Sequence, residues 1–292
     1  MTAPEQPRPG PRLLITGGSG FIGGRLLARA APDWPIAATY WSQSCAAENV
    51  AWYPLDVRDA AATDACLRAA RPEVVIHAAY RKDEPKAVIA RGTEHVVAAA
   101  ARVGARVLLI STDQVFDGGR GGYREEDEAR PVAAYGRAKL VAERAVLAAG
   151  GLVVRTSLVY ATRPPDPAHR ALLVEPLARG ETPTLFTDEY RSPTDVDDLA
   201  DALLELAAMR PEAWAALPLG GVLHVAGPER LDRYTFSLRL APHLGIPSER
   251  LSAGTLAASG LIRPADCSLD TGRARALLRT RLRPTSEVLG GD

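Results

Sequence analysis

The hydrophobic positions of this chain fall into short continuous runs, separated by longer stretches in which apolar residues recur at helical spacing. Strands buried on both faces are apolar throughout, whereas a helix packed on a sheet is apolar along one stripe only. Because crossovers between parallel strands are right-handed, this alternation predicts an α/β fold with a doubly wound parallel sheet. The predicted strands are 13–15, 36–40, 50–55, 74–76, 107–110 and 152–154, and the predicted helices are 21–30, 59–70, 84–103 and 131–149.

The alternation of apolar runs and helical stretches becomes less regular after Thr156, where the apolar runs are shorter and prolines are frequent. Open α/β sheets bind ligands at the carboxyl ends of their strands, and we expect the second half of the chain to cover those ends with a smaller lobe. The spacing predicts helices at 195–208, 234–244 and 271–278, and a strand at 222–225 that returns to the sheet. We expect a larger domain of 12–157 that takes in about 194–226, a smaller lobe of 158–193 and 227–292, and a flexible Pro-rich arm of 1–11.

A glycine-rich segment, Thr16-Gly17-Gly18-Ser19-Gly20-Phe21-Ile22-Gly23, lies directly between the first predicted strand and the first predicted helix. Glycines at this place allow a tight turn, let the backbone approach a pyrophosphate, and let the helix pack close to the strand. The helix N-terminus adds unpaired N–H donors and a partial positive charge. The sequence therefore predicts a Rossmann-type dinucleotide site, with cofactor contacts from Gly17, Gly20, Phe21, Ile22 and Gly23.

Residues after the second strand determine the choice between NAD and NADP, and here the sequence is Thr39-Tyr40-Trp41-Ser42. No carboxylate stands there to hold a free ribose 2′-hydroxyl, which weighs against strict use of NAD. No arginine stands there either, but the hydroxyls of Thr39 and Ser42 can donate hydrogen bonds to a 2′-phosphate. We therefore favour NADP and keep NAD as the alternative.

A tyrosine and a lysine stand four residues apart in Tyr135-Gly136-Arg137-Ala138-Lys139, near the start of a predicted helix. Only three of the 35 basic residues are lysines, so chance rarely produces this pairing. The spacing places both side chains on one helix face. A neighbouring ammonium stabilises phenolate and lowers the pKa of a tyrosine from its usual value of about 10. We expect Tyr135 to exchange a proton with the substrate, and Lys139 to assist it and to hold the cofactor ribose.

The composition narrows the class of partner and the compartment. The chain has 35 basic and 35 acidic residues, so it lacks the net positive charge that non-specific nucleic-acid binders need. Arg102 and Arg106 interrupt the most apolar stretch, which therefore does not predict a membrane span. Cys45, Cys66 and Cys267 are odd in number and lack metal-ligand spacing, which favours a reducing compartment. We expect a cytoplasmic protein without a metal site, and the sequence leaves monomer and homodimer open.

Several segments, in a constant order, resemble one family. The glycine loop and the Tyr135/Lys139 pair resemble the extended short-chain dehydrogenase/reductases. The segments 111–118, 135–143, 154–157, 191–200, 224–228 and 263–264 narrow the resemblance to the dTDP-4-dehydrorhamnose reductase-like branch. The resemblance runs from about residue 12 to residue 285. It implies an NAD(P)H-dependent reductase of the 4-keto group of a nucleotide-linked deoxysugar.

The resemblance also implies roles for single residues. Thr112 would hydrogen-bond the carbonyl oxygen of the substrate, and Tyr135 would deliver the proton while the nicotinamide delivers hydride. The cofactor's adenine would lie at Asp56 and Val57, and its ribose and pyrophosphate along His77, Ala78 and Ala79. The candidate substrate contacts are Asp113, Gln114, Leu158, Arg191 and Arg263, of which the two arginines suit a diphosphate.

Two departures from the family pattern affect the substrate pocket. Gln114 stands in place of a tyrosine, and Leu158 in place of a tryptophan that would line the sugar site, so the sugar stays open. One alternative is an epimerase or dehydratase of the same superfamily. It is disfavoured because Thr39 to Ser42 contain no acidic residue, and a dehydratase also because Gln114 supplies no second acid beside Asp113. Another is a cofactor-binding regulatory subunit resembling that of methionine adenosyltransferase, which is disfavoured by the retained tyrosine and lysine.

Overall fold

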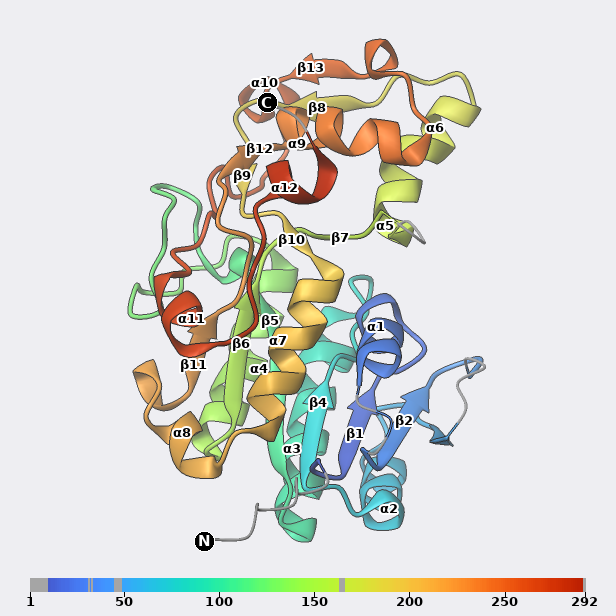
Figure 1. Cartoon of the computed structure of the whole chain (residues 1–292), viewed down its shortest axis with the longest axis vertical. Coiled ribbons are helices and arrows are strands. Elements are labelled where there is room, and N and C mark those ends of the chain that lie inside the picture. Colours follow the sequence, from blue (N-terminus) through green and yellow to red (C-terminus); the bar gives the residue numbers. More distant parts are fainter. Residues whose placement is uncertain (1–9, 31, 33, 45–48, 163–165, 291–292) are drawn as a thin grey trace, which may run out of the picture.

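The computed structural model describes residues 10–290 apart from 31, 33, 45–48 and 163–165. The predicted flexible arm therefore lies outside the described residues except for Gly10 and Pro11, and so does Cys45. In the described part, the chain forms a large body around a central sheet and a smaller body above it (Figure 1).

Seven parallel strands form the central sheet, in the order β11-β6-β5-β4-β1-β2-β3. The chain moves outward from β1 to β3, crosses back to β4, and moves outward again on the other side. Such a reversal is the point at which doubly wound sheets bind ligands. The predicted fold is confirmed, including the strand that returns late in the chain. The strands are β1 (Leu13–Thr16), β2 (Ile36–Tyr40), β3 (Val50–Pro54), β4 (Val74–His77), β5 (Arg106–Thr112), β6 (Leu152–Thr156) and β11 (Val222–His224).

Helices cover both faces of this sheet (Figure 1). Helices α1 (Phe21–Arg29) and α7 (Val196–Ala208) lie on one face, and α2 (Ala60–Ala70), α3 (Gly92–Val103) and α4 (Ala134–Ala148) on the other. Successive strand residues point to opposite faces. Leu13 and Ile15 therefore pack with the α7 side, whereas Leu14 packs with the α2 to α4 side. Because both faces are buried, the strands read as continuous apolar runs.

Two predicted helices differ from the structure at their N-terminal ends. The segment predicted as one helix over 84–103 is a π-helical stretch, Pro85–Arg91, followed by α3. π-helical turns are frequent at functional sites, and Val88 from this stretch lines the cavity described below. The helix predicted over 131–149 begins at Ala134, because Ala133 has an extended backbone with φ −104° and ψ 155°. Tyr135 therefore lies in the first turn of α4.

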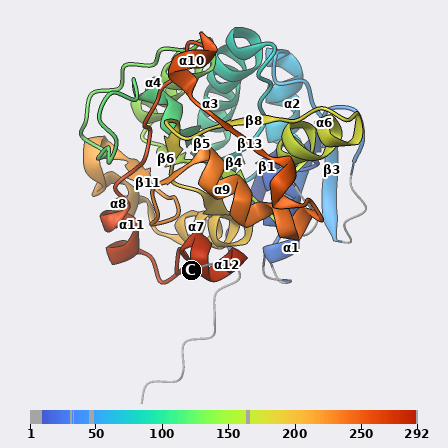
Figure 2. The same ribbon diagram turned by 90° about the horizontal axis from the view of Figure 1, so that it is seen from above.

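The smaller body lies over the carboxyl ends of the strands, with α9, β8 and β13 above the sheet when seen from the top (Figure 2). Tyr160, Leu185 and Phe236 are buried in its own core. Helix α11 was predicted to belong to the smaller lobe, but its residue Ala274 packs in the core of the large body. The domain boundaries otherwise stay a proposal. The remaining elements are β7 (Val159–Tyr160), β8 (Thr184–Phe186), β9 (Tyr190–Arg191), β10 (Thr194–Asp195), β12 (Leu231–Asp232), β13 (Ser252–Gly254), α5 (Pro167–His169), α6 (Glu175–Ala178), α8 (Pro211–Ala215), α9 (Arg233–Leu240), α10 (Leu256–Ser259), α11 (Gly272–Leu277) and α12 (Thr285–Leu289).

Candidate active site

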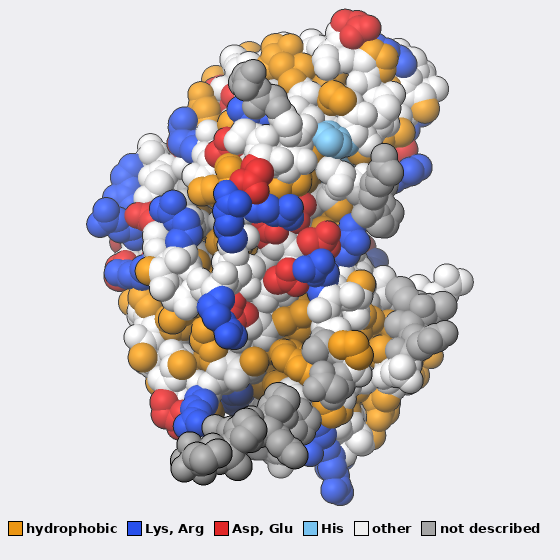
Figure 3. All heavy atoms as spheres, viewed as in Figure 1, with side chains coloured by type: hydrophobic (Ala, Val, Ile, Leu, Met, Phe, Trp, Pro, Cys, Tyr) orange, Lys and Arg blue, Asp and Glu red, His pale blue; other side chains and the backbone are white. Residues whose placement is uncertain are grey.

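A cavity of about 690 Å³ lies between the strand ends and the smaller body. The surface is hollowed on the side where α1 faces α5 (Figure 3). The cavity wall combines the glycine loop, Tyr135 and Lys139 of the large body with residues of the smaller body such as Glu189 and Arg233. Its volume is in the range of small-molecule sites, roughly 300–1,000 Å³.

The glycine loop has the close backbone approaches that its sequence predicts. Gly17 has a φ of 68°, a conformation that favours glycine, and a Cβ there would lie 2.9 Å from the Cα atom of Ala79. A Cβ on Gly23 would lie 2.2 Å from the carbonyl oxygen of Gly17. The N-cap residue of α1 is Gly20, which has no side chain to cap the helix. The N–H groups of Gly17, Gly18 and Gly20 donate within the protein, so the donors left for a pyrophosphate are those of the first turn of α1.

The edge formed by the ends of β2 and β3 differs from the expectation for the cofactor ribose. Thr39 is buried, and its hydroxyl oxygen accepts the N–H of Gly17 at 3.0 Å, so it supports the glycine loop. Ser42 is exposed and is not among the described residues that line the cavity. A cation is nevertheless present at this edge, because Arg58 lines the cavity with its guanidinium 5.1 Å from the centroid of the Trp41 ring.

Arg58 is held by two carboxylates. Its Nε donates to both carboxylate oxygens of Asp56, at 3.0 and 2.9 Å, and its Nη1 donates to Glu84 at 2.6 Å. The hydrogen bonds from Arg58 hold the pKa of Asp56 below its usual value. Asp56 and Val57 line the cavity as expected.

His77 supports the site from behind the cavity wall and is not among the described lining residues. The Thr93 hydroxyl donates to the carbonyl of Ile89 at 2.6 Å, so it must accept from Nε2 of His77, 3.0 Å away. Nδ1 of His77 then accepts from the hydroxyl of Thr16 at 2.6 Å. Burial, with the charge of Lys139 as a second cause, lowers the pKa of His77 to about 3. His77 is thus a neutral strut beneath Ala78 and Ala79, which do line the cavity.

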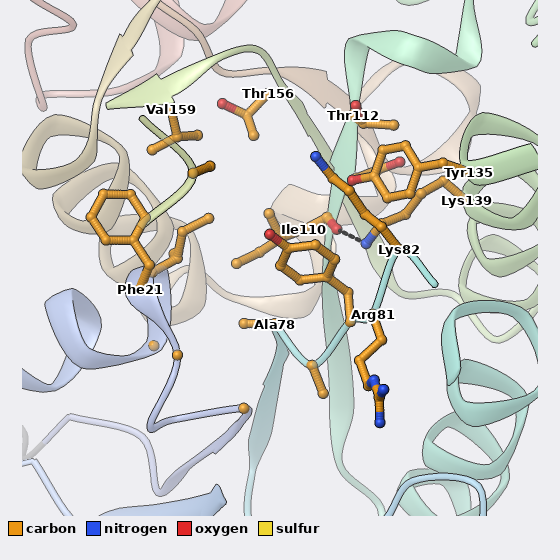
Figure 4. Close-up of a pocket in the computed structure, with 18 of the residues that line it drawn as sticks. Phe21, Ala78, Arg81, Lys82, Ile110, Thr112, Tyr135, Lys139, Thr156 and Val159 are labelled. Atoms are coloured by element: carbon orange, nitrogen blue, oxygen red, sulfur yellow. Dashed lines mark hydrogen bonds between the residues drawn. The ribbon is translucent and has the colours of Figure 1, made fainter. Parts of the chain in front are cut away.

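Thr112, Tyr135 and Lys139 converge at the carboxyl end of β5 (Figure 4). The ammonium of Lys139 donates to the carbonyl of Ile110 at 2.7 Å. Thr112 and Tyr135 line the same part of the cavity. The hydroxyl of Thr112 donates to a carboxylate oxygen of Asp113 at 3.0 Å. A hydroxyl, a phenol and an ammonium therefore meet on one wall.

The electrostatics of this trio correct one expectation. Burial raises the pKa of Tyr135 above its usual value, and Tyr80 and Asp113 act in the same direction. The neighbouring hydroxyl of Thr112 opposes this rise in the pKa by less. The prediction of a lowered tyrosine pKa was therefore wrong, because the cost of a buried phenolate exceeds the stabilisation by nearby groups. Burial also lowers the pKa of Lys139 to about 8. Tyr135 consequently keeps its proton at neutral pH, which is the state of a proton donor.

Arg191 lines the cavity, but its donors are committed to protein groups. It is buried, and its Nη1 donates to the carbonyl of Tyr190 at 2.6 Å. Its Nη2 donates to Glu189 at 3.0 Å and to the carbonyl of Pro264 at 3.1 Å, and its Nε lies 3.5 Å from Asp113. Arg191 therefore connects Tyr190 of strand β9, Pro264 and Asp113 within one wall of the cavity.

Two other arginines, Arg263 and Arg233, have fewer protein partners for their guanidinium groups. The side chain of Arg263 is 54% exposed and lies 3.5 Å from Glu189. Arg233, at the start of α9, lines the cavity, and its guanidinium makes no hydrogen bond or ion pair with any described residue. Burial lowers the pKa of Arg233 to about 10, although Glu189 opposes this shift. Arg233 is charged at neutral pH and is available to an anion.

Leu158 and Gln114 also line the cavity, where the family pattern has aromatic side chains. Leu158 has a φ of 21°, which is rare for a residue with a side chain. Its carbonyl accepts the N–H of Thr194 at 3.1 Å, which helps to hold this conformation. The wall here is aliphatic and polar instead of aromatic.

Most of the predicted site residues thus surround one cavity, with His77 and Ser42 outside its described lining. Sequence reasoning missed further lining residues. Lys82 carried a signal, as one of only three lysines in the chain, whereas nothing distinguished Arg233 from the many other arginines. The missed lining residues used in the arguments below are Trp41, Arg58, Tyr80, Lys82, Glu189 and Arg233.

Other kinds of site are not found in the described part of the chain. None of its His, Cys, Asp and Glu side chains form a group of three or more that could hold a metal ion. Cys66 and Cys267 are buried and form no disulfide. No helix among the described residues combines the length and the apolar character needed to cross a membrane.

Comparison with known proteins places this geometry in a family. The chain matches the model of the RmlD substrate binding domain over residues 11–290. It is 35% identical over 256 residues to dTDP-4-dehydrorhamnose reductase of Mycobacterium tuberculosis, covering 82% of this chain and 78% of that protein. It is 28% identical over 269 residues to methionine adenosyltransferase 2 subunit beta of Xenopus tropicalis, covering 83% of this chain and 75% of that one.

The fold is also that of a solved relative. The crystal structure of dTDP-4-dehydrorhamnose reductase from Bacillus anthracis in complex with NADP superposes with a TM-score of 0.77 at 22% identity, covering 96% of this chain and 97% of that one. The family match spans nearly the whole described chain, and the resemblance read from the sequence is confirmed. The chain belongs to the RmlD family of extended short-chain dehydrogenase/reductases.

Proposed function

We propose that the chain reduces the 4-keto group of a nucleotide-linked 4-keto-6-deoxysugar with NADPH. The observation that carries the proposal is the convergence of Thr112, Tyr135 and Lys139 on a cavity that also contains the glycine loop. The dTDP-4-dehydrorhamnose reductase of M. tuberculosis supports this class of substrate. The B. anthracis structure with NADP supports this cofactor.

The residues of the loop fit a dinucleotide. A side chain at Gly17 or Gly23 would collide with backbone, so the glycines let α1 begin close to the loop. The N–H groups of the first turn of a helix have no partner within the helix and suit a pyrophosphate. When bound, NADPH supplies the hydride that reduces the carbonyl carbon. We assign the pyrophosphate to Gly17, Gly20, Phe21, Ile22 and Gly23, the adenine to Asp56 and Val57, the ribose to Lys139, and the cofactor path between them to Ala78 and Ala79.

The chain's own residues manage the proton and the developing charge. Tyr135 holds a proton at neutral pH, because burial raises its pKa, and it can pass that proton to a carbonyl oxygen. The hydroxyl of Thr112 lines the same wall, and it can bind the same oxygen when its proton turns from Asp113 to the substrate. Donors placed in advance stabilise negative charge on oxygen more strongly in a water-poor cavity than in water. These two groups supply the acid and the anchor for the reaction.

The substrate is proposed to lie along the wall that the smaller body contributes. Arg263 and Arg233 have the free donors that a diphosphate needs, whereas Arg191 orients the wall through Glu189 and Asp113. Gln114 and Leu158 would contact the sugar, and Asp113 would accept the proton of Thr112 while the site holds no substrate.

A cofactor-binding regulatory subunit is the second candidate function. It is favoured by the similarity to methionine adenosyltransferase 2 subunit beta. In that role the cavity would bind the dinucleotide without turning over a ketosugar. An epimerase or dehydratase is less well supported, since Gln114 offers no second acid beside Asp113.

The test is NADPH consumption with dTDP-linked 4-keto-6-deoxysugars, comparing the wild type, Tyr135→Phe and the control Tyr53→Phe. The control substitution also removes a tyrosine hydroxyl, but Tyr53 lies in β3 and is not among the described lining residues. We expect turnover in the wild type and in Tyr53→Phe, and a loss of at least about a hundredfold in Tyr135→Phe with NADPH binding retained. NADPH binding without turnover by the wild type would favour the regulatory function. Conversion of the sugar without net NADPH consumption would favour the epimerase.

A further inference from the structure

A second lysine reaches the reaction centre from the loop after β4. The ammonium of Lys82 lies 5.5 Å from the centroid of the Tyr135 ring, and Lys82 lines the cavity. Figure 4 shows its side chain passing close to the phenol of Tyr135. Contacts of this length between an ammonium and an aromatic face are attractive.

The two lysines are held differently. Lys139 gives a hydrogen bond to the carbonyl of Ile110. The ammonium of Lys82 makes no hydrogen bond or ion pair with any described residue, and its aromatic neighbour is Tyr135. The surrounding charges are mixed, because Asp166 and Asp113 attract the ammonium while Arg233 and Arg263 repel it. Among the described residues, no carboxylate contacts the ammonium of Lys82 directly.

The chemistry of Tyr135 creates a need for such a cation. In the proposed reduction, the O–H bond of Tyr135 breaks and a new O–H bond forms on the carbonyl oxygen of the substrate. The hydride that balances the step comes from the oxidation of bound NADPH, and the phenolate later regains a proton from solvent. Between these events Tyr135 carries a negative charge in a wall that already contains the carboxylate of Asp113. A buried phenolate is costly unless a positive charge lies close to it.

We propose that Lys82 compensates the negative charge of Tyr135 as the proton leaves, and so acts as a second positioning lysine of the reaction. This inference rests on the proposed function. It differs from the roles of Lys139, since Lys82 approaches the ring face from another element and has no backbone partner among the described residues. The consequence is that removing Lys82 slows proton transfer while leaving the binding of the cofactor unchanged.

The experiment compares Lys82→Gln, Lys82→Arg and the matched control Lys86→Gln. Lys86 is a neighbouring exposed lysine that is not among the described lining residues. For Lys82→Gln we expect kcat to fall about tenfold, with the Kd for NADPH and the KM for the ketosugar within twofold of the wild type. Because proton transfer becomes slower, the solvent deuterium isotope effect on kcat should rise. Lys82→Arg should restore most of kcat, and Lys86→Gln should match the wild type.

Several results would overturn the inference. An unchanged kcat in Lys82→Gln would do so, and so would a change confined to KM, which would make Lys82 a substrate-binding residue. An equal loss in Lys82→Arg would show that a cation is not what the site requires. An unchanged isotope effect would separate Lys82 from the proton transfer. Absence of turnover in the wild type would overturn the proposed function as well, whereas wild-type turnover with an unaffected Lys82→Gln overturns this inference alone.

Discussion

The guanidinium of Arg58 lies 5.1 Å from the centroid of the Trp41 ring, although the two residues follow different strands. Trp41 comes directly after β2, and Arg58 follows β3. The strands are parallel, with Tyr40 opposite Pro54, so their ends meet at one edge of the sheet. A cation near the end of β2 therefore comes from the residues that follow β3.

We predict that Arg58→Gln weakens NADPH binding about tenfold and NADH binding much less. The substitution removes the cation and leaves Asp56 and Glu84 without their common partner, which adds repulsion toward a 2′-phosphate. Fluorescence titration with each nucleotide gives the two Kd values. The control is Arg68→Gln, an exposed arginine on α2 paired with Asp64. Equal losses for NADPH and NADH would contradict a role at the 2′-phosphate.

Local patterns made the sheet and the glycine loop predictable. Leu13, Leu14 and Ile15 are all apolar because each face of β1 is buried, and this signal lies within three consecutive residues. The close approach of Gly23 to Gly17 is likewise fixed by residues six apart. Geometry that depends on residues close together in the chain can be predicted from the sequence.

Long-range neighbours were not predictable in the same way. Arg58 joins Trp41 through strand pairing, and Arg233 reaches the cavity from a helix of the smaller body. The prediction that the pKa of Tyr135 would be lowered was wrong for a related reason. The spacing to Lys139 is local, but burial, which raises that pKa, depends on the whole cavity. Desolvation is a tertiary property that no motif contains.

The titration of Lys139 leads to a second prediction. Burial lowers its pKa to about 8, so its charge is present below that pH and is lost as the pH rises through it. We expect NADPH affinity to fall between pH 7 and pH 9 in the wild type. Lys139→Ala should bind NADPH more weakly at pH 7 and should lack this step. Binding titrations across the pH range test both points, and a variant with wild-type affinity would refute the proposed contact with the ribose.

The buried pair of Glu143 and Arg155 supports the third prediction. Nη2 of Arg155 donates to Glu143 at 2.8 Å, and both side chains are almost fully buried. Glu143→Gln leaves the charge of Arg155 without its partner, so we expect the free energy of unfolding to fall by about 3–5 kcal/mol. Urea denaturation measures this change. The exposed pair of Glu128 and Arg130 provides the control, since Glu128→Gln should unfold like the wild type. A similar stability for the two variants would mean that Glu143 is dispensable.

The neutral state of His77 makes the stability of the fold depend on pH. Burial lowers the pKa of His77 from 6.5 to about 3, so the unfolded chain takes up a proton at a pH where the folded one does not. The contribution of His77 is therefore complete above pH 6.5 and is lost progressively as the pH falls toward 3. Between pH 7.5 and pH 5 this site alone should reduce the free energy of unfolding by about 2 kcal/mol. His77→Gln cannot titrate, so its deficit relative to the wild type in urea denaturation should be largest at pH 7.5 and should shrink by about that amount at pH 5. A deficit that stays constant across this range would mean that His77 has the same pKa in the folded and unfolded chain, and that the hydrogen bond from Thr16 does not keep its Nδ1 unprotonated.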